Sequence, residues 1–153
     1  LSFLGSAPKG SAVAALTESA FSSFGWKKGT SRFVPLAMEI PNESLRHDAM
    51  RGLFDSWTKL NVVESAEAIR GLPEGPLRDS AITGFNRSAT SRRPELAFEM
   101  AARISVAAAR DRELISQGRE WLKKNPTAAE SAIRNSPVVP GNVKVEIFKE
   151  SSR

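Results

Sequence analysis

The chain has 153 residues, of which 41% are hydrophobic and 25% are charged, enough apolar material for one folded domain. It contains no cysteine and a single histidine, His47, so the composition excludes disulfide scaffolds, thiol nucleophiles, thiolate metal sites and histidine-rich metal centres. The net charge of +5 favours anionic partners in general and specifies none.

The sequence gives little information about the compartment of the chain or its association with a membrane. No apolar run reaches the about 18 residues that mark a membrane-spanning helix, so we expect no span in this chain. The sequence begins with Leu1 rather than methionine, and we therefore expect it to be a processed or excised piece of a longer protein. The absence of cysteine fits the cytoplasm and the cell envelope equally well.

A period of 32 residues runs through the sequence. Arginine recurs at this spacing, small residues form a second column, and apolar residues form three more. Five independent columns with one period indicate an internal repeat. The columns are Arg46, Arg78 and Arg110; Ala20, Gly52, Gly84 and Ser116; Ile40, Leu72 and Ile104; Met50, Ile82 and Leu114; and Phe21, Leu53 and Phe85.

Within each unit the apolar residues follow helical spacing. Asn42 and Asn125 suit helix N-caps, and prolines at 94 and 126 suit the first turn. The tail after Pro140 alternates as a strand would, but the register predicts a helix, which we favour because a lone strand would lack a partner. The helices preceding it are expected at about 10–24, 31–40, 43–58, 62–71, 75–89, 94–104, 107–123 and 126–135.

These elements predict an all-α fold, an αα-superhelix (solenoid) of helical hairpins with a 32-residue period. One hairpin cannot bury both of its faces, so successive hairpins stack into a continuous core. Gly52 and Gly84 are expected to let the longer helices approach closely, which offsets the roughly 1 kcal/mol that a mid-helix glycine costs. The single domain, 1–153, would comprise a half repeat at 10–24, repeats at about 30–58, 62–90 and 94–123, and a partial repeat at 126–151.

The recurrent Arg46, Arg78 and Arg110 have two interpretations. In the first, which we favour, they bridge neighbouring repeats by bonding carboxylates or the carbonyls at helix ends. In the second, they form an arginine ladder that lines a groove for acidic ligands.

A second set of basic residues recurs where a longer helix ends and the next helix begins. Cations at helix C-termini interact favourably with the helix dipole, which explains the pattern without a ligand. Stacked repeats would also line them along one edge, where they would bind nucleic acid or another anionic surface. This possible anion-binding edge comprises Lys27, Lys28, Lys59, Arg92, Arg93, Lys123 and Lys124.

The remaining residues that could take part in catalysis or binding are interpreted as structural. His47 stands between Arg46 and Asp48, but neighbours in a helix point in different directions, so His47 and Asp48 do not form a dyad. Trp57 and Trp121, two periods apart, are expected in the core rather than at an exposed binding surface. We therefore expect no catalytic residue, no metal and no cofactor.

Two stretches of the sequence carry a family resemblance. Trp121-LKKNPTAAESAI and Leu72-PEGPLRDSA resemble the units of uncharacterised bacterial αα-helical-repeat proteins of the tetratricopeptide/Sel1-like solenoid class. The resemblance covers roughly residues 30–137. It implies a scaffold that binds proteins or peptides and carries over no catalytic residue. The first unit departs from the pattern by lacking the Asn-Pro start, and the third lacks the Leu-Pro-x-Gly turn.

The expected function is a non-catalytic helical-repeat scaffold that binds a protein or peptide through shallow contacts along its concave face. The alternative is binding of nucleic acid or another anionic surface through the basic edge, which the shortage of interleaved aromatic residues disfavours. The terminal stretches lack the polar outer faces of capping repeats, so end-to-end self-association is also expected.

Overall fold

The computed structural model describes residues 30–149, which form helices and short connections with no strand among them. The helix expected over 10–24, together with Lys27 and Lys28, lies outside the described residues. The short 3-10 helix η1 (Thr30–Arg32) is followed by α3 (Phe33–Met38), α4 (Glu43–Leu60), α5 (Val62–Arg70), α6 (Pro76–Ala89), α7 (Pro94–Ala101), α8 (Ala107–Lys124), α9 (Pro126–Asn135) and α10 (Gly141–Lys149). The all-α prediction is confirmed, and the tail is a helix.

Short polar residues start the helices where the sequence places them. The side chains of Asn42, Asn61 and Asn125 accept hydrogen bonds from backbone N–H groups three residues later, at 3.0, 3.0 and 3.3 Å. Asn61 also marks the end of α4, so a single residue separates this helix from α5. Pro76, Pro94 and Pro126 each occupy the first turn of a helix, where the missing N–H costs nothing.

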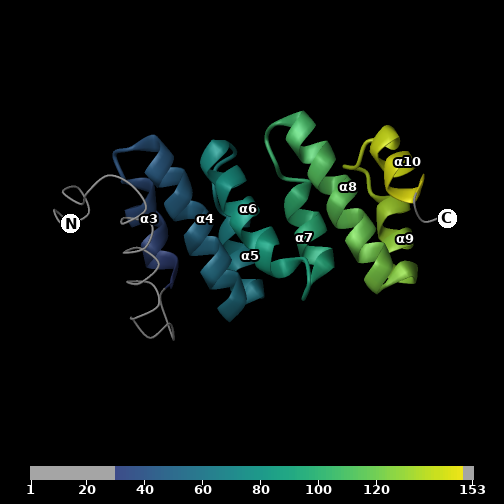
Figure 1. The fold of residues 1–153 in the computed structure, drawn as a ribbon, viewed down its shortest axis with the longest axis horizontal. Coiled ribbons are helices and arrows are strands. Elements are labelled where there is room, and N and C mark those ends of the chain that lie inside the picture. Colours follow the sequence, from purple (N-terminus) through teal and green to yellow (C-terminus); the bar gives the residue numbers. More distant parts are fainter. Residues whose placement is uncertain (1–29, 150–153) are drawn as a thin grey trace.

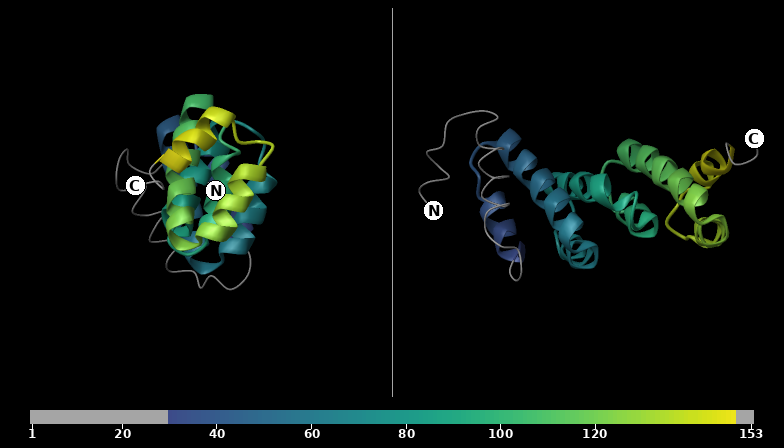
Figure 2. Two further views of the ribbon diagram at one scale, coloured as in Figure 1. Left: turned by 90° about the vertical axis from the view of Figure 1, so that its right-hand side faces the viewer. Right: turned by 60° about the horizontal axis from the view of Figure 1, so that its bottom comes forward.

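The helices follow one another along the long axis of the molecule, with α3 near one end and α10 at the other (Figure 1). Viewed along that axis they overlap in a narrow outline (Figure 2, left). Each helix packs against its neighbour in the chain from α3 to α9, and α4 additionally packs along α6, as does α8 along α10. Among residues 30–149, no helix has the length and apolar content needed to cross a membrane.

The buried apolar side chains fall into two clusters. The first extends from α3 to α7 and contains Trp57, which is 1% exposed and lies 5.4 Å from the Phe54 ring. The second extends from α7 to α10 and includes Phe98, whose ring lies 5.7 Å from that of the partly buried Trp121. Helix α7 supplies Met100 to the first cluster and Phe98 to the second. The division between the two clusters therefore lies at α7, between α6 and α8.

Candidate functional site

Helices α4 and α6 are in close contact at Gly84, which has no side chain to hold the two backbones apart. A Cβ placed on residue 84 would lie 2.8 Å from the carbonyl carbon of Arg51 and 3.0 Å from its Cα, and would overlap the carbonyl oxygen. Any side chain at this position would force the two backbones apart. Two hydrogen bonds flank the approach, each joining residues 33 positions apart. His47 Nδ1 lies 2.6 Å from Ser80 Oγ, and Ser88 Oγ donates to Asp55 Oδ1 at 2.5 Å.

The other described members of the small-residue column, Gly52 and Ser116, do not make this contact, which corrects the expectation for Gly52, while Ala20 lies outside the described residues. Gly52 is exposed, and a Cβ there would meet no atom within 4 Å. One period after Gly84 stands Ser116, which is exposed on α8. Ser116 does not line the opening between α6 and α8, and these two helices contact each other through side chains.

A cleft of about 560 Å³ opens between α6 and α8. Both helices and the connection that precedes α8 contribute to its walls. Its apolar lining is formed by Ile82, Ile104, Val106 and Ala109. Its polar lining is formed by Asp79, Ser80, Thr83, Asn86, Arg87, Thr90, Arg112, Glu113 and Gln117.

A polar network joins the two walls of the cleft. Asn86 Nδ2 and Gln117 Nε2 both donate to Glu113 Oε1, at 3.1 and 2.9 Å, and Thr90 Oγ1 donates to Gln117 Oε1 at 2.9 Å. Asn86 and Glu113 are 27 positions apart, as are Thr90 and Gln117, against 33 between α4 and α6. The α6–α8 pair is thus held by side chains in a different register rather than by backbone contact.

The Asp79 carboxylate fixes the connection that enters α8. Its Oδ1 accepts hydrogen bonds from the backbone N and the hydroxyl of Ser105, at 2.9 and 3.1 Å. The residue before α8, Val106, supplies no side-chain cap of its own. Asp79 therefore holds the connection two residues before α8 begins and does not cap the N–H groups of the helix itself.

Not every polar group in the cleft is satisfied. Asn86 is 4% exposed, and its Oδ1 is buried without a hydrogen-bond donor. Arg87 and Arg112 are exposed at the cleft and contact no carboxylate, while Arg112 donates only to the carbonyl of Ala108 in its own helix, at 3.4 Å. A buried acceptor without a donor costs on the order of 1–3 kcal/mol, so its retention in a cleft wall is a reason to consider a ligand.

The recurrent arginines lie outside this cleft. Arg46 donates to the Ile40 carbonyl at 3.0 Å, and Arg78 donates to the Arg103 carbonyl, just past the end of α7, at 2.7 Å. Arg110 lies 3.5 Å from its sequence neighbour Asp111. The first two therefore contact carbonyls near helix ends.

The basic edge is occupied by intramolecular partners throughout its described part. Arg92 donates to the Lys59 carbonyl at the end of α4, at 2.9 Å, and Lys124 donates to the Ser91 carbonyl just past α6. Each therefore binds the end of the preceding long helix, where the dipole favours a cation. The remaining described cations pair with nearby carboxylates: Lys59 with Asp55, Arg93 with Glu95, and Lys123 with Glu120.

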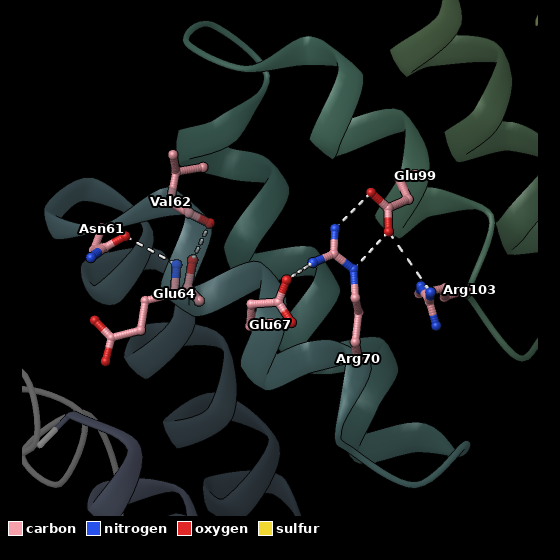
Figure 3. A network of polar contacts seen from close by, with 8 residues as sticks. Asn61, Val62, Glu64, Glu67, Arg70, Glu99 and Arg103 are labelled. Carbon is pink, nitrogen blue, oxygen red and sulfur yellow. Dashed lines mark hydrogen bonds and ion pairs between the residues drawn. The ribbon is translucent and has the colours of Figure 1, made fainter. Parts of the chain in front are cut away.

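An ion-pair cluster joins α5 to α7, as Figure 3 shows. Arg70 Nε and Nη2 donate to the two carboxylate oxygens of Glu99, both at 2.8 Å, and Nη1 donates to Glu67. Arg103 lies 3.8 Å from the same Glu99 carboxylate. The hydrogen bonds that Arg70 donates to Glu99 lower the pKa of Glu99, and the same bonds raise the pKa of Arg70. With two acids and two bases, the cluster is neutral and acts as a bridge between the short helices.

His47 and Ser80 are brought together without the other parts of a hydrolytic site. Ser80 is buried within helix α6, where backbone N–H groups bond the carbonyls one turn earlier and leave no pair free for an oxyanion. Asp48 pairs with Arg51 and does not orient the imidazole. In the described part of the chain, no three histidine or carboxylate side chains are grouped so that they could hold a metal ion.

The sequence analysis missed the cleft and its lining, because each lining residue is ordinary for a helix surface when read alone. Arg70 and Glu99 were missed because they are 29 positions apart and follow no repeat column. In comparisons with known proteins, no family model, no curated protein and no solved structure matches the chain.

Proposed function

We propose that the chain is a non-catalytic helical-repeat scaffold and that it binds an extended peptide segment of a partner protein in the cleft between α6 and α8. The observation that carries the proposal is the cleft. It is a long opening between two consecutive longer helices, α6 and α8, and its lining is both apolar and polar. Binding sites of this kind combine apolar surface with a few polar groups that fix orientation.

The proposal includes the solenoid with its 32-residue period. Its support is the order of alternating short and longer helices and the recurrence of contacts 33 positions apart between α4 and α6. In a regular stack each long helix would pack along the next. The cleft between α6 and α8 would then be a local interruption of the stack. Such an interruption would give the scaffold a recessed binding site in place of a flat face.

The size and the chemistry of the cleft suit an extended segment. Its lining extends from Asp79 to Thr90 on α6, about 16 Å at 1.5 Å per helical residue, which matches roughly five residues of extended chain. An extended chain carries unpaired backbone N–H and C=O groups. These groups would find partners among the hydroxyl, amide and guanidinium side chains of the cleft lining.

No observation favours the basic edge as an anion-binding surface, because each described cation of that edge already bonds a carboxylate or a helix-end carbonyl. The absence of catalysis stays part of the proposal. It is supported by the position of Ser80 inside a helix and by the engagement of Asp48 with Arg51.

Selection from a library of displayed random peptides tests the proposed function on the full chain. Ala109→Trp would fill the cleft, whereas Ala108→Trp adds the same ring at an exposed neighbouring position that does not line it. We expect selected peptides to bind the chain and the Ala108→Trp variant alike, and to lose at least tenfold in affinity for Ala109→Trp. Failure to select any peptide, or equal binding to both variants, would overturn the proposal.

A further inference from the structure

The arginines of the cleft differ from the other cations of the chain. Among residues 30–149, every lysine and arginine except Arg87 has a hydrogen bond, an ion pair or another polar or ring interaction. Arg112 has only the long bond to the Ala108 carbonyl of its own helix. Both side chains line the same cleft from opposite walls. Two guanidinium groups that pair with no carboxylate therefore line one site.

The bond that spans the cleft joins residues adjacent in sequence to these two arginines. Asn86 on α6 bonds Glu113 on α8 at 3.1 Å. Arg87 follows Asn86 and Arg112 precedes Glu113, and both arginines line the cleft that this bond spans. Guanidinium groups present planar forks of N–H donors that match a carboxylate in bidentate geometry.

The acidic side chains of the cleft, in contrast, already have donors. Glu113 accepts from two side-chain amides, and Asp79 accepts from the backbone and hydroxyl of Ser105. A cationic occupant would find these carboxylates engaged and would face two guanidinium groups of the same sign. An anionic occupant would find two guanidinium groups that have no carboxylate partner. Charge complementarity thus favours an acid over a base in the cleft.

We propose that Arg87 and Arg112 form a clamp for an aspartate or glutamate side chain of the bound segment, so that the partner of the cleft is an acidic peptide. This inference rests on the proposed function. The apolar lining around Ile104, Val106 and Ala109 lies toward the Asp79 end of the cleft, and Val106 is 60% exposed. The segment would therefore carry an apolar residue on one side of its acidic residue.

The peptides selected on the full chain provide the first measurement. We expect aspartate or glutamate to be enriched at one position among peptides whose binding is lost in Ala109→Trp. For such a peptide, Arg87→Gln and Arg112→Gln should each weaken binding about tenfold, the usual effect of removing one hydrogen bond to a charged group. Arg93→Gln changes an exposed arginine outside the cleft lining and serves as the matched control, with binding unchanged.

A double-mutant cycle completes the test. Replacing the acidic residue of the peptide by its amide should cost about tenfold with the wild-type chain and little with Arg87→Gln, because the same interaction is then already lost. If peptides occupy the cleft without an acidic position, or if the arginine variants bind as the wild type does, the clamp is wrong while the proposed function stands. If a single-stranded oligonucleotide displaces the peptide and depends on the same arginines, the occupant is a phosphate polymer and the acidic-peptide proposal is overturned. If no peptide binds at all, both proposals fail.

Discussion

The guanidinium of Arg70 holds both carboxylate oxygens of Glu99, which lies 29 positions later in the sequence. This bidentate pair is the main polar link between α5 and α7, and it lies where the first apolar cluster gives way to the second. The side chain of Glu99 remains 39% exposed, so solvent screening weakens the pair. Bidentate geometry partly offsets this loss, and we assign it about 1 kcal/mol of stability.

Glu99→Gln tests this contribution through its pH dependence. The pKa of Glu99 is lowered in the folded chain, chiefly by its hydrogen bonds from Arg70. Its stabilisation is therefore present above the unfolded value of about 4.3 and is lost as the pH falls through the folded pKa. We expect Glu99→Gln to lower the free energy of unfolding by about 1 kcal/mol near neutral pH, with the difference shrinking below about pH 4.

Glu67→Gln is the matched control, since Glu67 contacts the same arginine but is far more exposed. Chemical denaturation at several pH values should show a change of about 0.3 kcal/mol or less for this variant. Equal effects of the two substitutions, or a Glu99→Gln effect that grows on acidification, would contradict the assigned role of Glu99.

Gly84→Ala tests the close packing of α4 and α6. An alanine in a helix is ordinarily stabilising relative to glycine by roughly 1 kcal/mol, but here the methyl group would overlap the Arg51 carbonyl. Because backbone and not a flexible side chain occupies the space, we expect a net loss of about 1–3 kcal/mol, measured by thermal or chemical unfolding. Gly52→Ala, placed one period earlier with open space around the new methyl, should leave stability unchanged or raise it. A Gly84→Ala variant as stable as the wild type would show that the helices separate at little cost.

The helix positions were predictable from the sequence because their determinants are local. Asn125 and Pro126 indicate the start of α9, and the structure begins that helix at Pro126. The helix expected over 94–104 instead ends at Ala101. No Leu-Pro pair marks its end in the sequence, and Asp79 of another helix holds the connection that follows it. The cleft was not predictable because it depends on the register between α6 and α8. Asn86 bonds Glu113 and Thr90 bonds Gln117, both 27 positions later, whereas the sequence columns predict a constant step of 32 residues.

Asn61→Ala tests a helix start that the sequence analysis did not single out. The Asn61 side chain caps α5 by accepting from the backbone N of Glu64 at 3.0 Å. Losing this cap should cost about 1 kcal/mol in the free energy of unfolding. Asn61→Asp retains the acceptor and should leave stability nearly unchanged, so equal destabilisation by both variants would indicate that the amide nitrogen matters instead.

Asp79→Ala tests the attachment of the connection that enters α8. Removing the carboxylate leaves the N–H and hydroxyl of Ser105 without the acceptor that holds them at 2.9 and 3.1 Å. We expect a loss of about 1–2 kcal/mol in global stability. The Ser105 amide should also exchange its hydrogen faster with solvent, because the connection opens locally.

Asp48→Ala is the control for this prediction. It removes an exposed aspartate that pairs only with Arg51, and it should change stability by less than about 0.5 kcal/mol. If hydrogen exchange at Ser105 were the same in Asp79→Ala as in the wild type, the carboxylate would not fix this end of the cleft, and the mouth between α6 and α8 would be held by the Asn86–Glu113 and Thr90–Gln117 bonds alone.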